Sequence, residues 1–238
     1  MNTTTATASE QLGRVAEEQR EWEQAPGITN IWESYSQART YHHLGIVAQE
    51  LREWEDARGY YQQALSLFIE YNDRHSQAST YHNLGIVAQQ LREWEDARGY
   101  YQQALSLFIE YNDRHSQART YHQLGIVAEE LREWEDARGY YQQALSIKIE
   151  YNDRHSQART YHQLGRVAEE LEEWGEAITL FLQALQIFAE FGDEHSGGIV
   201  LRGISRVYQA TQDESLLTTL AEMFGVSVEE MKTAISQQ

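Results

Sequence analysis

The sequence predicts an all-α fold in which antiparallel helix pairs stack into a solenoid with irregular ends. Three observations lead to this prediction: a 40-residue unit that recurs along the chain, helical spacing of apolar residues within it, and turn-forming residues at fixed places. A repeat array has no single core, because each unit buries its apolar face only against its neighbours. The length of 238 residues therefore reflects a number of units rather than a number of globular domains.

Residues 1–35 precede the four full repeats. Residues 1–10 are polar and lack periodicity, which predicts a disordered N-terminal tail. Residues 11–35 form a degenerate N-terminal repeat, since QLGRVAEEQREWEQA from Gln11 matches the middle of the later units. We expect a break at Pro26 and Gly27, followed by a short stub of helix through Tyr35 that caps the array. The four full repeats are then 36–75, 76–115, 116–155 and 156–195.

Each unit is expected to hold two helices, helix A and helix B. Apolar or small residues step by threes and fours through both. In the first unit these residues are Ala38, Tyr41, Leu44, Gly45, Ala48 and Leu51 in helix A, and Trp54, Ala57, Tyr61, Ala64, Leu65 and Phe68 in helix B. After helix B, Asn72 suits the left-handed backbone that follows a helix end, and Asp73 suits the N-cap of the next helix. The fourth unit supports this turn, because Gly192 stands where the others have asparagine.

Residues 196–238 are expected to form a degenerate C-terminal repeat and capping helices. A last helix A is predicted over 196–211 and a further helix over 215–224. Ser227 and Glu230 then have the spacing of a capping box that opens a final short helix. The alternative to a simple cap is a second docking surface. Its residues would be Met223, Phe224, Val226, Val228 and Met231.

Composition excludes several classes of partner. With 19 basic and 37 acidic residues, the formal net charge is −18, which repels nucleic acid and anionic membrane surfaces. Only two residues, Lys148 and Lys232, are lysines, and cysteine is absent, which excludes disulfides. The N-terminal stretch lacks the pattern of a signal peptide, and no apolar run reaches the length of a membrane span. We therefore expect a cytoplasmic protein that binds neither nucleic acid nor membrane.

The nine histidines do not predict a metal site. Eight of them recur with the repeat, and equivalent positions in stacked helix pairs lie about 8–10 Å apart, whereas zinc ligands lie about 2 Å from the ion. Polar contacts on a wet face or at a turn are the expected role of these side chains. The sequence also lacks the common nucleophile, metalloprotease and phosphate-loop motifs, so we expect no catalytic residues, no cofactor and no enzyme activity.

The linked positions of the unit resemble the tetratricopeptide repeat. The shared pattern is Leu-Gly in helix A, an aromatic near the inter-helix turn, and Ala, aromatic and Ala-Leu in helix B. The four copies are Leu44, Gly45, Trp54, Ala57, Tyr61, Ala64 and Leu65; Leu84, Gly85, Trp94, Ala97, Tyr101, Ala104 and Leu105; Leu124, Gly125, Trp134, Ala137, Tyr141, Ala144 and Leu145; and Leu164, Gly165, Trp174, Ala177, Phe181, Ala184 and Leu185.

The unit departs from this family in two ways. Its period is 40 residues rather than about 34, and the proline that usually ends helix B is absent. Both departures indicate longer helices, as in kinesin light chains and Pins-like polarity adaptors. The resemblance implies a right-handed superhelical α-solenoid whose concave groove is lined by helix A of each repeat and binds partner proteins.

The positions at which the three close copies differ point to the same side of helix A. Six positions vary, and four of them lie on helix A, beginning with Arg39, His43, Gln49 and Glu50. On a helical wheel this variable edge lies opposite the core residues, which spread over about 120° to 240° from Arg39. Surface drift explains such variation equally simply. Apolar Ile46 and its two counterparts on this polar edge favour a contact surface instead.

We call this edge the helix-A stripe and predict it as the partner-binding surface. It consists of Arg39, His42, His43, Ile46, Gln49, Glu50, Ser79, His82, Asn83, Ile86, Gln89, Gln90, Arg119, His122, Gln123, Ile126, Glu129, Glu130, Arg159, His162, Gln163, Arg166, Glu169 and Glu170.

The predicted function is that of a non-catalytic scaffold or adaptor. Its partner would be a peptide or helix of another protein, with basic residues toward the later repeats, where the stripe carries glutamates. The alternative is a self-associating module, because near-identical units expose similar surfaces at their ends and can form homo-oligomers.

Overall fold

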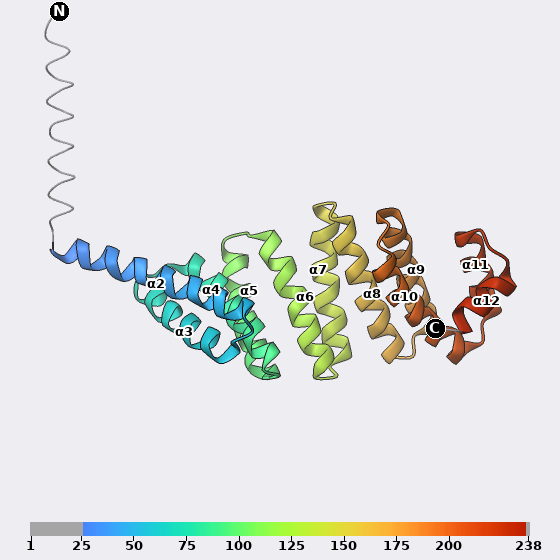
Figure 1. The fold of residues 1–238 in the computed structure, drawn as a ribbon, viewed down its shortest axis with the longest axis horizontal. Coiled ribbons are helices and arrows are strands. Elements are labelled where there is room, and N and C mark those ends of the chain that lie inside the picture. The colour runs from blue at the N-terminus through green and yellow to red at the C-terminus, as the bar shows by residue number, and fades with distance from the viewer. Residues whose placement is uncertain (1–25, 237–238) are drawn as a thin grey trace, which may run out of the picture. The chain divides into compact units, whose positions relative to one another are not determined.

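The computed structural model describes residues 26–236 of the chain, and the side chains of residues 35–235. The tail predicted at 1–10 and the part of the degenerate repeat at 11–25 lie outside the described residues. All regular structure in the described residues is helical, and the described helices belong to two compact units, residues 26–92 and 93–236. The predicted fold class, an all-α array of antiparallel helix pairs, is confirmed (Figure 1).

The helices follow the 40-residue period of the sequence. Unit 1 contains α2 (Pro26–Glu50), α3 (Trp54–Glu70) and α4 (Arg74–Gln90). Unit 2 contains α5 (Trp94–Glu110), α6 (Arg114–Glu130), α7 (Trp134–Glu150), α8 (Arg154–Glu170), α9 (Trp174–Phe191), α10 (Glu194–Thr211), α11 (Glu214–Phe224) and α12 (Val228–Ser236). Helices A are thus α2, α4, α6, α8 and α10, and helices B are α3, α5, α7 and α9.

The predicted break at Pro26 and Gly27 borders residues 11–25, which lie outside the described residues, but the helical stub expected after it is not separate from helix A. Pro26 is the first residue of α2, which runs without interruption through Tyr35 into helix A of the first repeat and ends at Glu50. The physical reason is that a proline in the first turn of a helix loses no hydrogen bond, because the N–H groups of that turn have no partner within the helix. The separate helical stub is therefore part of helix A.

The turn between repeats has the predicted chemistry. Asn72 adopts φ +53° and Gly192 φ +67°, both in the left-handed region. The carboxylate of Asp73 accepts a hydrogen bond from the backbone N–H of Ser76 at 3.0 Å, and Asp153 caps α8 through Ser156 at 3.1 Å. The same turn geometry recurs with the 40-residue period, so each helix B is connected to the next helix A in the same way.

The turn between helix A and helix B contains left-handed residues that the sequence did not predict. Arg52, Arg92, Arg132 and Glu172 adopt φ between 59° and 62°. A residue with a Cβ is less stable in this conformation than glycine, by about 1 kcal/mol. The following N–H groups compensate in part: Glu133 N–H, for example, donates to the Ala128 carbonyl at 2.9 Å and closes the helix end.

The helix pairs pack around small residues in helix A. A Cβ at Gly125 would lie 2.4 Å from the ring of Tyr141, and one at Gly45 would lie 2.6 Å from the ring of Tyr61. The glycine of the Leu-Gly pair in these repeats therefore allows the helix-B aromatic to lie directly against the helix-A backbone. These rings are fully buried and form the centre of each pair.

Main-chain carbonyls tie consecutive repeats together. The amide of Gln77 donates to the Phe68 carbonyl at 2.9 Å, and Gln157 donates to the Lys148 carbonyl at 3.0 Å. Ion pairs add a second link within unit 2, among them Arg98 with Glu133 at 2.5 Å. Exposed pairs of this kind stabilise by less than about 1 kcal/mol, so apolar burial holds the array together.

Candidate functional site

The helix-A stripe lies on α2 and α4 in unit 1 and on α6 and α8 in unit 2. Residues three and four apart share one face of a helix, so the six stripe residues of each helix lie together. We call the equivalent stripe positions of the four repeats a row. The row of Arg39 and the row of Glu50 are exposed in most repeats. The exposed stripe residues are Arg39, His43, Glu50, Gln90, Arg119, Glu130, Arg159, Arg166 and Glu170. Half-buried are His42, Ile46, Gln49, Ser79, Asn83, Ile86, Gln89, His122, Gln123, Ile126, His162, Gln163 and Glu169.

In unit 1, stripe residues of two helices share one hollow. Arg39, His42 and His43 of α2 line a cavity of about 150 Å³ together with Ser79 of α4 and the ring of Phe68 from α3. His42 spans it, because its Nδ1 lies 3.0 Å from the hydroxyl of Thr80 on α4. Neighbouring helices A therefore contribute to a common surface, as the stripe requires.

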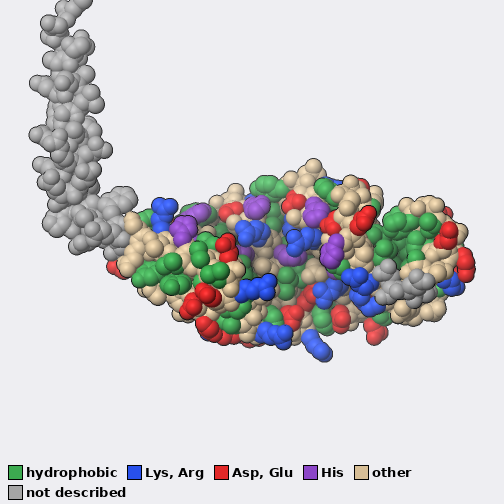
Figure 2. All heavy atoms as spheres, viewed as in Figure 1, with side chains coloured by type: hydrophobic (Ala, Val, Ile, Leu, Met, Phe, Trp, Pro, Cys, Tyr) green, Lys and Arg blue, Asp and Glu red, His purple; other side chains and the backbone are tan. Residues whose placement is uncertain are grey.

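Unit 2 contains a hollow built in the same way. It has a volume of about 250 Å³, and its floor is Phe188, the counterpart of Phe68. The residues that line it are His122, Ile126, Arg159, His162, Gln163, Phe188, Ser196 and Ile199. Figure 2 shows histidine side chains beside basic ones in the part of the molecule that α6 to α8 occupy in Figure 1.

Of the stripe histidines only His43 lies on a wet face, which is the position that the sequence predicts for all of them; those at the position of His42 are at least partly buried. His82 is only 6% exposed, and the rings of His42 and His122 lie 5.5 and 5.4 Å from the buried rings of Tyr61 and Tyr141. His42, His122 and His162 thus lie at the end of the core, next to the helix-B aromatic. Such a position withdraws the ring from water, which disfavours its charged form.

Burial sets the protonation of these rings. It lowers the pKa of His122 to about 3, with Lys148 and Arg159 adding to the effect. Burial also lowers the pKa of His162 to about 4, with Arg166 and Arg206 adding to it. Both rings are therefore neutral at pH 7, and they can donate or accept a hydrogen bond rather than attract an anion as cations.

The row of Gln49 serves the core rather than facing only solvent. The hydroxyl of Tyr61 donates to Gln49 Oε1 at 3.0 Å. In the third repeat Glu129 takes this place, is only 8% exposed, and is hydrogen-bonded to Tyr141. The helical wheel places the variable edge opposite the core, whereas in the structure this row borders the core. The physical reason is that a buried phenol needs a hydrogen-bond partner, and this row is the nearest source of one.

Two glutamates of the later repeats are already paired within the chain. Arg166 lies 3.2 Å from Glu129, and Arg206 holds both carboxylate oxygens of Glu169 at 2.6 and 2.8 Å. Burial raises the pKa of Glu129, and Arg166 opposes this effect. Among the later glutamates of the stripe, Glu130 and Glu170 are the exposed ones, so fewer carboxylates remain for a basic partner than the sequence suggested.

Helix-B residues contribute to the hollows in a way that the helix-A wheel cannot show. Phe68 and Phe188 form their floors, and Lys148 occupies the same position in the third repeat. A signal was present in the sequence, since this position is one of the six that vary among the close copies. A helical wheel drawn for helix A alone does not include the side chains that helix B contributes to the same hollow.

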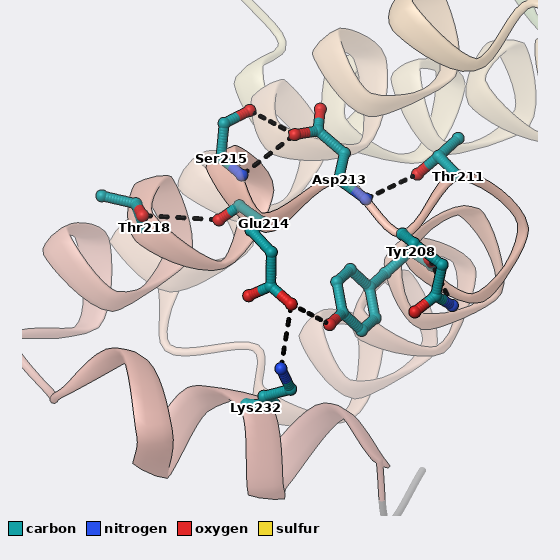
Figure 3. Close-up of polar contacts among 8 residues, drawn as sticks. Tyr208, Thr211, Asp213, Glu214, Ser215, Thr218 and Lys232 are labelled. Carbon is teal, nitrogen blue, oxygen red and sulfur yellow. Dashed lines mark hydrogen bonds and ion pairs between the residues drawn. The ribbon is translucent and has the colours of Figure 1, made fainter.

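At the C-terminal end, polar contacts fix the last three helices (Figure 3). Glu214 accepts hydrogen bonds from the Tyr208 hydroxyl at 3.1 Å and from the Lys232 amine at 2.9 Å, which joins α10, α11 and α12. The predicted capping box is present, with Glu230 N–H donating to Ser227 Oγ at 3.2 Å and Ser227 N–H to the Glu230 carboxylate at 2.8 Å.

Of the five residues predicted as an alternative docking surface at this end, four are exposed and one is buried. Met231 is buried in the core of unit 2. Met223, Phe224, Val226 and Val228 remain exposed, and two of them line an apolar cavity of about 370 Å³.

Two further findings concern the described residues alone. Within them, no group of three or more histidines and carboxylates is arranged to hold a metal ion. Nor does any helix of the described part have the length and apolar character needed to cross a membrane.

These features define a class: proteins built from stacked antiparallel helix pairs whose helices A share surface hollows. The sequence profile of the tetratricopeptide repeat matches residues 36–110, 76–150 and 156–215, so the chain belongs to this family. Domains of this family are generally protein-interaction modules. The comparison with curated protein sequences found no match.

Solved structures share the fold at low sequence identity. BtubC from P. vanneervenii is 19% identical with a TM-score of 0.68, over 100% of this chain and 94% of its own. A Podospora anserina putative kinesin light chain with nearly identical repeats is 19% identical with a TM-score of 0.65, over 85% and 96%.

A third similar structure is a much larger protein. It is the signal-transduction ATPase PH0952 from Pyrococcus horikoshii, which carries a tetratricopeptide repeat sensor. It is 17% identical with a TM-score of 0.70, over 82% of this chain and 32% of its own length. This chain therefore spans about a third of that protein. At these identities the three structures show the fold alone.

Proposed function

We propose that the chain is a non-catalytic protein-interaction scaffold whose helix-A stripe holds a peptide or a helix of another protein in a concave groove. The observation that carries the proposal is the recurrence of one hollow. In each unit, stripe residues of neighbouring helices A surround a helix-B side chain, with Arg39 and His42 in one case and His122 and Arg159 in the other. A surface that repeats its hollows can receive an extended or helical segment at several points.

The chemistry of the stripe supports the same proposal. Half-buried Ile46, Ile86 and Ile126 lie on a face that is otherwise polar. Protein interfaces typically combine a few apolar contacts with surrounding hydrogen-bonding groups. Where the partner carries basic residues, Glu130 and Glu170 are the exposed glutamates that can meet them in the later repeats.

The test uses substitutions that the array itself already tolerates. Arg119→Ser and Arg159→Ser introduce the residue found at Ser79, and Ile126→Arg introduces the residue found at Arg166. The full chain and the triple variant are compared as baits in extracts of the native host, with quantification of the captured proteins. We expect at least one protein that binds the parent chain and is reduced at least tenfold with the variant.

A matched control separates the stripe from general surface changes. Gln102→Ala, Gln103→Ala and Gln142→Ala alter exposed positions on helices B. This control variant should retain the partner. Equal loss in both variants, or no loss in either, would overturn the assignment to the stripe.

Self-association is the second candidate, and a specific observation favours it. Leu44 and Val47 on α2, and Leu51 just after it, are 39%, 51% and 63% exposed, while Leu84 and Val87, the equivalents of the first two, are buried. No helix within residues 26–236 covers this apolar face of α2, and a second copy of the chain would bury it.

Light scattering over a concentration series tests this candidate. Leu51→Glu should keep the chain monomeric if α2 forms the contact, and the parent chain should gain mass with concentration. A parent chain that is monomeric at every concentration excludes self-association through this face. Deletion of residues 196–238 is a poor test, since it removes Val200 and Ile204 from the core.

A further inference from the structure

One helix-B position differs chemically between otherwise similar repeats. This position holds Phe68, Phe108 and Phe188 in the first, second and fourth repeats, and Lys148 in the third repeat. Phe68 and Phe188 are buried and form the floors of the two hollows. Lys148 therefore places an amine where the other repeats place an aromatic ring.

The amine is held against α8 rather than extended into water. The Lys148 carbonyl accepts a hydrogen bond from the Gln157 amide at 3.0 Å, which fixes the backbone of this residue. Its Nζ donates to the hydroxyl of Thr160 at 2.7 Å, and Thr160 is fully buried. Long basic side chains usually carry their charge out to solvent, so this half-buried position is unusual.

Lys148 changes the surroundings of a neighbouring histidine. In unit 1, Nδ1 of His42 is 3.0 Å from the hydroxyl of Thr80. In the third repeat the corresponding hydroxyl, that of Thr160, accepts from Lys148 and donates to the Ser156 carbonyl at 3.0 Å. Nδ1 of His122 is consequently buried without a hydrogen-bond partner. Buried polar atoms normally have a partner, so this nitrogen is free to bind a ligand.

The local charge is positive. His122 and Arg159 line the same hollow, and Arg159 is exposed without an ion pair in the part of the chain that the structure describes. Burial lowers the pKa of Lys148 to about 8, with Arg159 lowering it further and Asp153 opposing them. The Asp153 carboxylate is itself engaged by the N–H of Ser156 at 3.1 Å, as the cap of α8. By contrast, Arg166 and Arg206 elsewhere on this side are each paired with a glutamate.

We propose that Lys148, His122 and Arg159 form a binding site for a single oxyanion, a carboxylate or a phosphate group, carried by the protein that the helix-A stripe binds. The amine and the guanidinium donate charge-assisted hydrogen bonds to its oxygens, and the ring of His122 donates a third from Nδ1. The anion offsets the repulsion among these groups. That a partner protein supplies the group rests on the proposed function, whereas binding of the anion itself does not.

The two lysines of the chain make the site directly observable. Full-length protein labelled with ¹³C and ¹⁵N in lysine gives side-chain NMR signals from Lys148 and Lys232 alone. Lys232 is an internal reference, because it is exposed enough to report on solvent and is bonded to Glu214 on α11 (Figure 3). The probes are sodium acetate and sodium phosphate, each exchanged for sodium chloride at constant ionic strength and pH 7.

We expect the Lys148 signals to shift saturably with at least one probe, and the pKa of Lys148 to rise by about one unit in its presence because an anion favours the charged amine. Saturation with acetate alone assigns a carboxylate, and saturation with phosphate alone assigns a phosphate group. Lys148 signals that follow those of Lys232 in both arms would overturn the proposal.

Variants sharpen the result. Arg159→Ser should weaken the affinity of the saturable shift at least tenfold, whereas Arg39→Ser, which removes an exposed arginine from the hollow of unit 1, should leave it unchanged. An unchanged affinity in Arg159→Ser would also contradict the site. Circular dichroism establishes that both variants are folded. Because these titrations contain no partner protein, their failure is distinct from a failure of the capture experiment above.

Discussion

His42 and His122 occupy the same place in two similar repeats, yet their surroundings differ. The ring of His42 contacts Phe68 and reaches the hydroxyl of Thr80. The ring of His122 has no such partner, because Lys148 replaces the phenylalanine and takes the equivalent hydroxyl. One substitution on helix B thus replaces an aromatic ring by an amine next to the helix-A histidine. The comparison teaches that the helix packing, or frame, and the chemistry of the surface are set by different residues. The glycine and tyrosine pairs set the frame, and the position of Phe68 and Lys148 sets the chemistry.

Acid should have the largest effect on this comparison. The folded state keeps the pKa of His122 near 3, below its ordinary value, so only the unfolded chain gains a proton at this residue between about pH 6.5 and 4. Stability is fully present above pH 6.5 and falls on acidification, by about 3 kcal/mol at pH 4 from this residue. Urea unfolding across this range should show that His122→Gln removes most of that dependence.

His42→Gln is the matched variant, and it should remove less, since the pKa of His42 is lowered without a neighbouring lysine. Equal changes in the pH dependence of the two variants would contradict the difference between the two rings.

The shared frame should respond equally in both repeats. Gly45→Ala and Gly125→Ala each force a methyl group into the ring of a buried tyrosine, so each should lower the free energy of unfolding by about 2 kcal/mol. Gly59→Ala and Gly139→Ala are the controls. Their added methyl groups meet open space, and a better helix former should stabilise by about 0.5–1 kcal/mol. A large difference between Gly45→Ala and Gly125→Ala in urea unfolding would show that the frames are not equivalent.

Removal of the buried amine should stabilise the third repeat. Lys148→Phe is expected to raise the free energy of unfolding at pH 7 by about 1–2 kcal/mol, which is the desolvation cost less the lost hydrogen bond. The folded-state pKa of about 8 lies below the ordinary value for lysine, so the penalty is present below pH 8. It disappears as the pH rises toward 10, and the advantage of the variant should shrink over the same range. A pH-independent advantage would indicate packing alone.

The smallest effect is expected where the later repeats pair their own charges. Arg206→Gln breaks a bidentate pair with Glu169, but Arg206 is about half exposed, so the loss should stay below about 1 kcal/mol and should vanish in 1 M salt. A loss that persists in high salt would mean that this pair is structurally central.

Much of the fold follows from local sequence rules. Asn72 and Gly192 take the left-handed turn, Asp73 caps the next helix, and Ser227 and Glu230 form their box, because each depends on a few neighbouring residues. The continuity of α2 from Pro26 into helix A was harder to predict, and the cause is local as well. The same residue type ends a helix from within and starts one from its first turn, and the sequence pattern does not distinguish the two cases.

The candidate site was less predictable because it depends on contacts between helices. A wheel for one helix places Glu129 and His82 at the edge of the core, but only the packed neighbour decides that both are buried. The role of Lys148 was hidden for the same reason, since its side chain acts on α8 and α6 rather than on its own helix.

The glutamine that joins consecutive repeats bonds to a main-chain oxygen, at Phe68 in one seam and at Lys148 in another. Every amino acid supplies that oxygen, so the register of the helices is indifferent to the side chain displayed there. Evolution or a protein engineer can therefore exchange this one residue, copy by copy, and obtain a row of recognition subsites with distinct preferences on an unaltered framework.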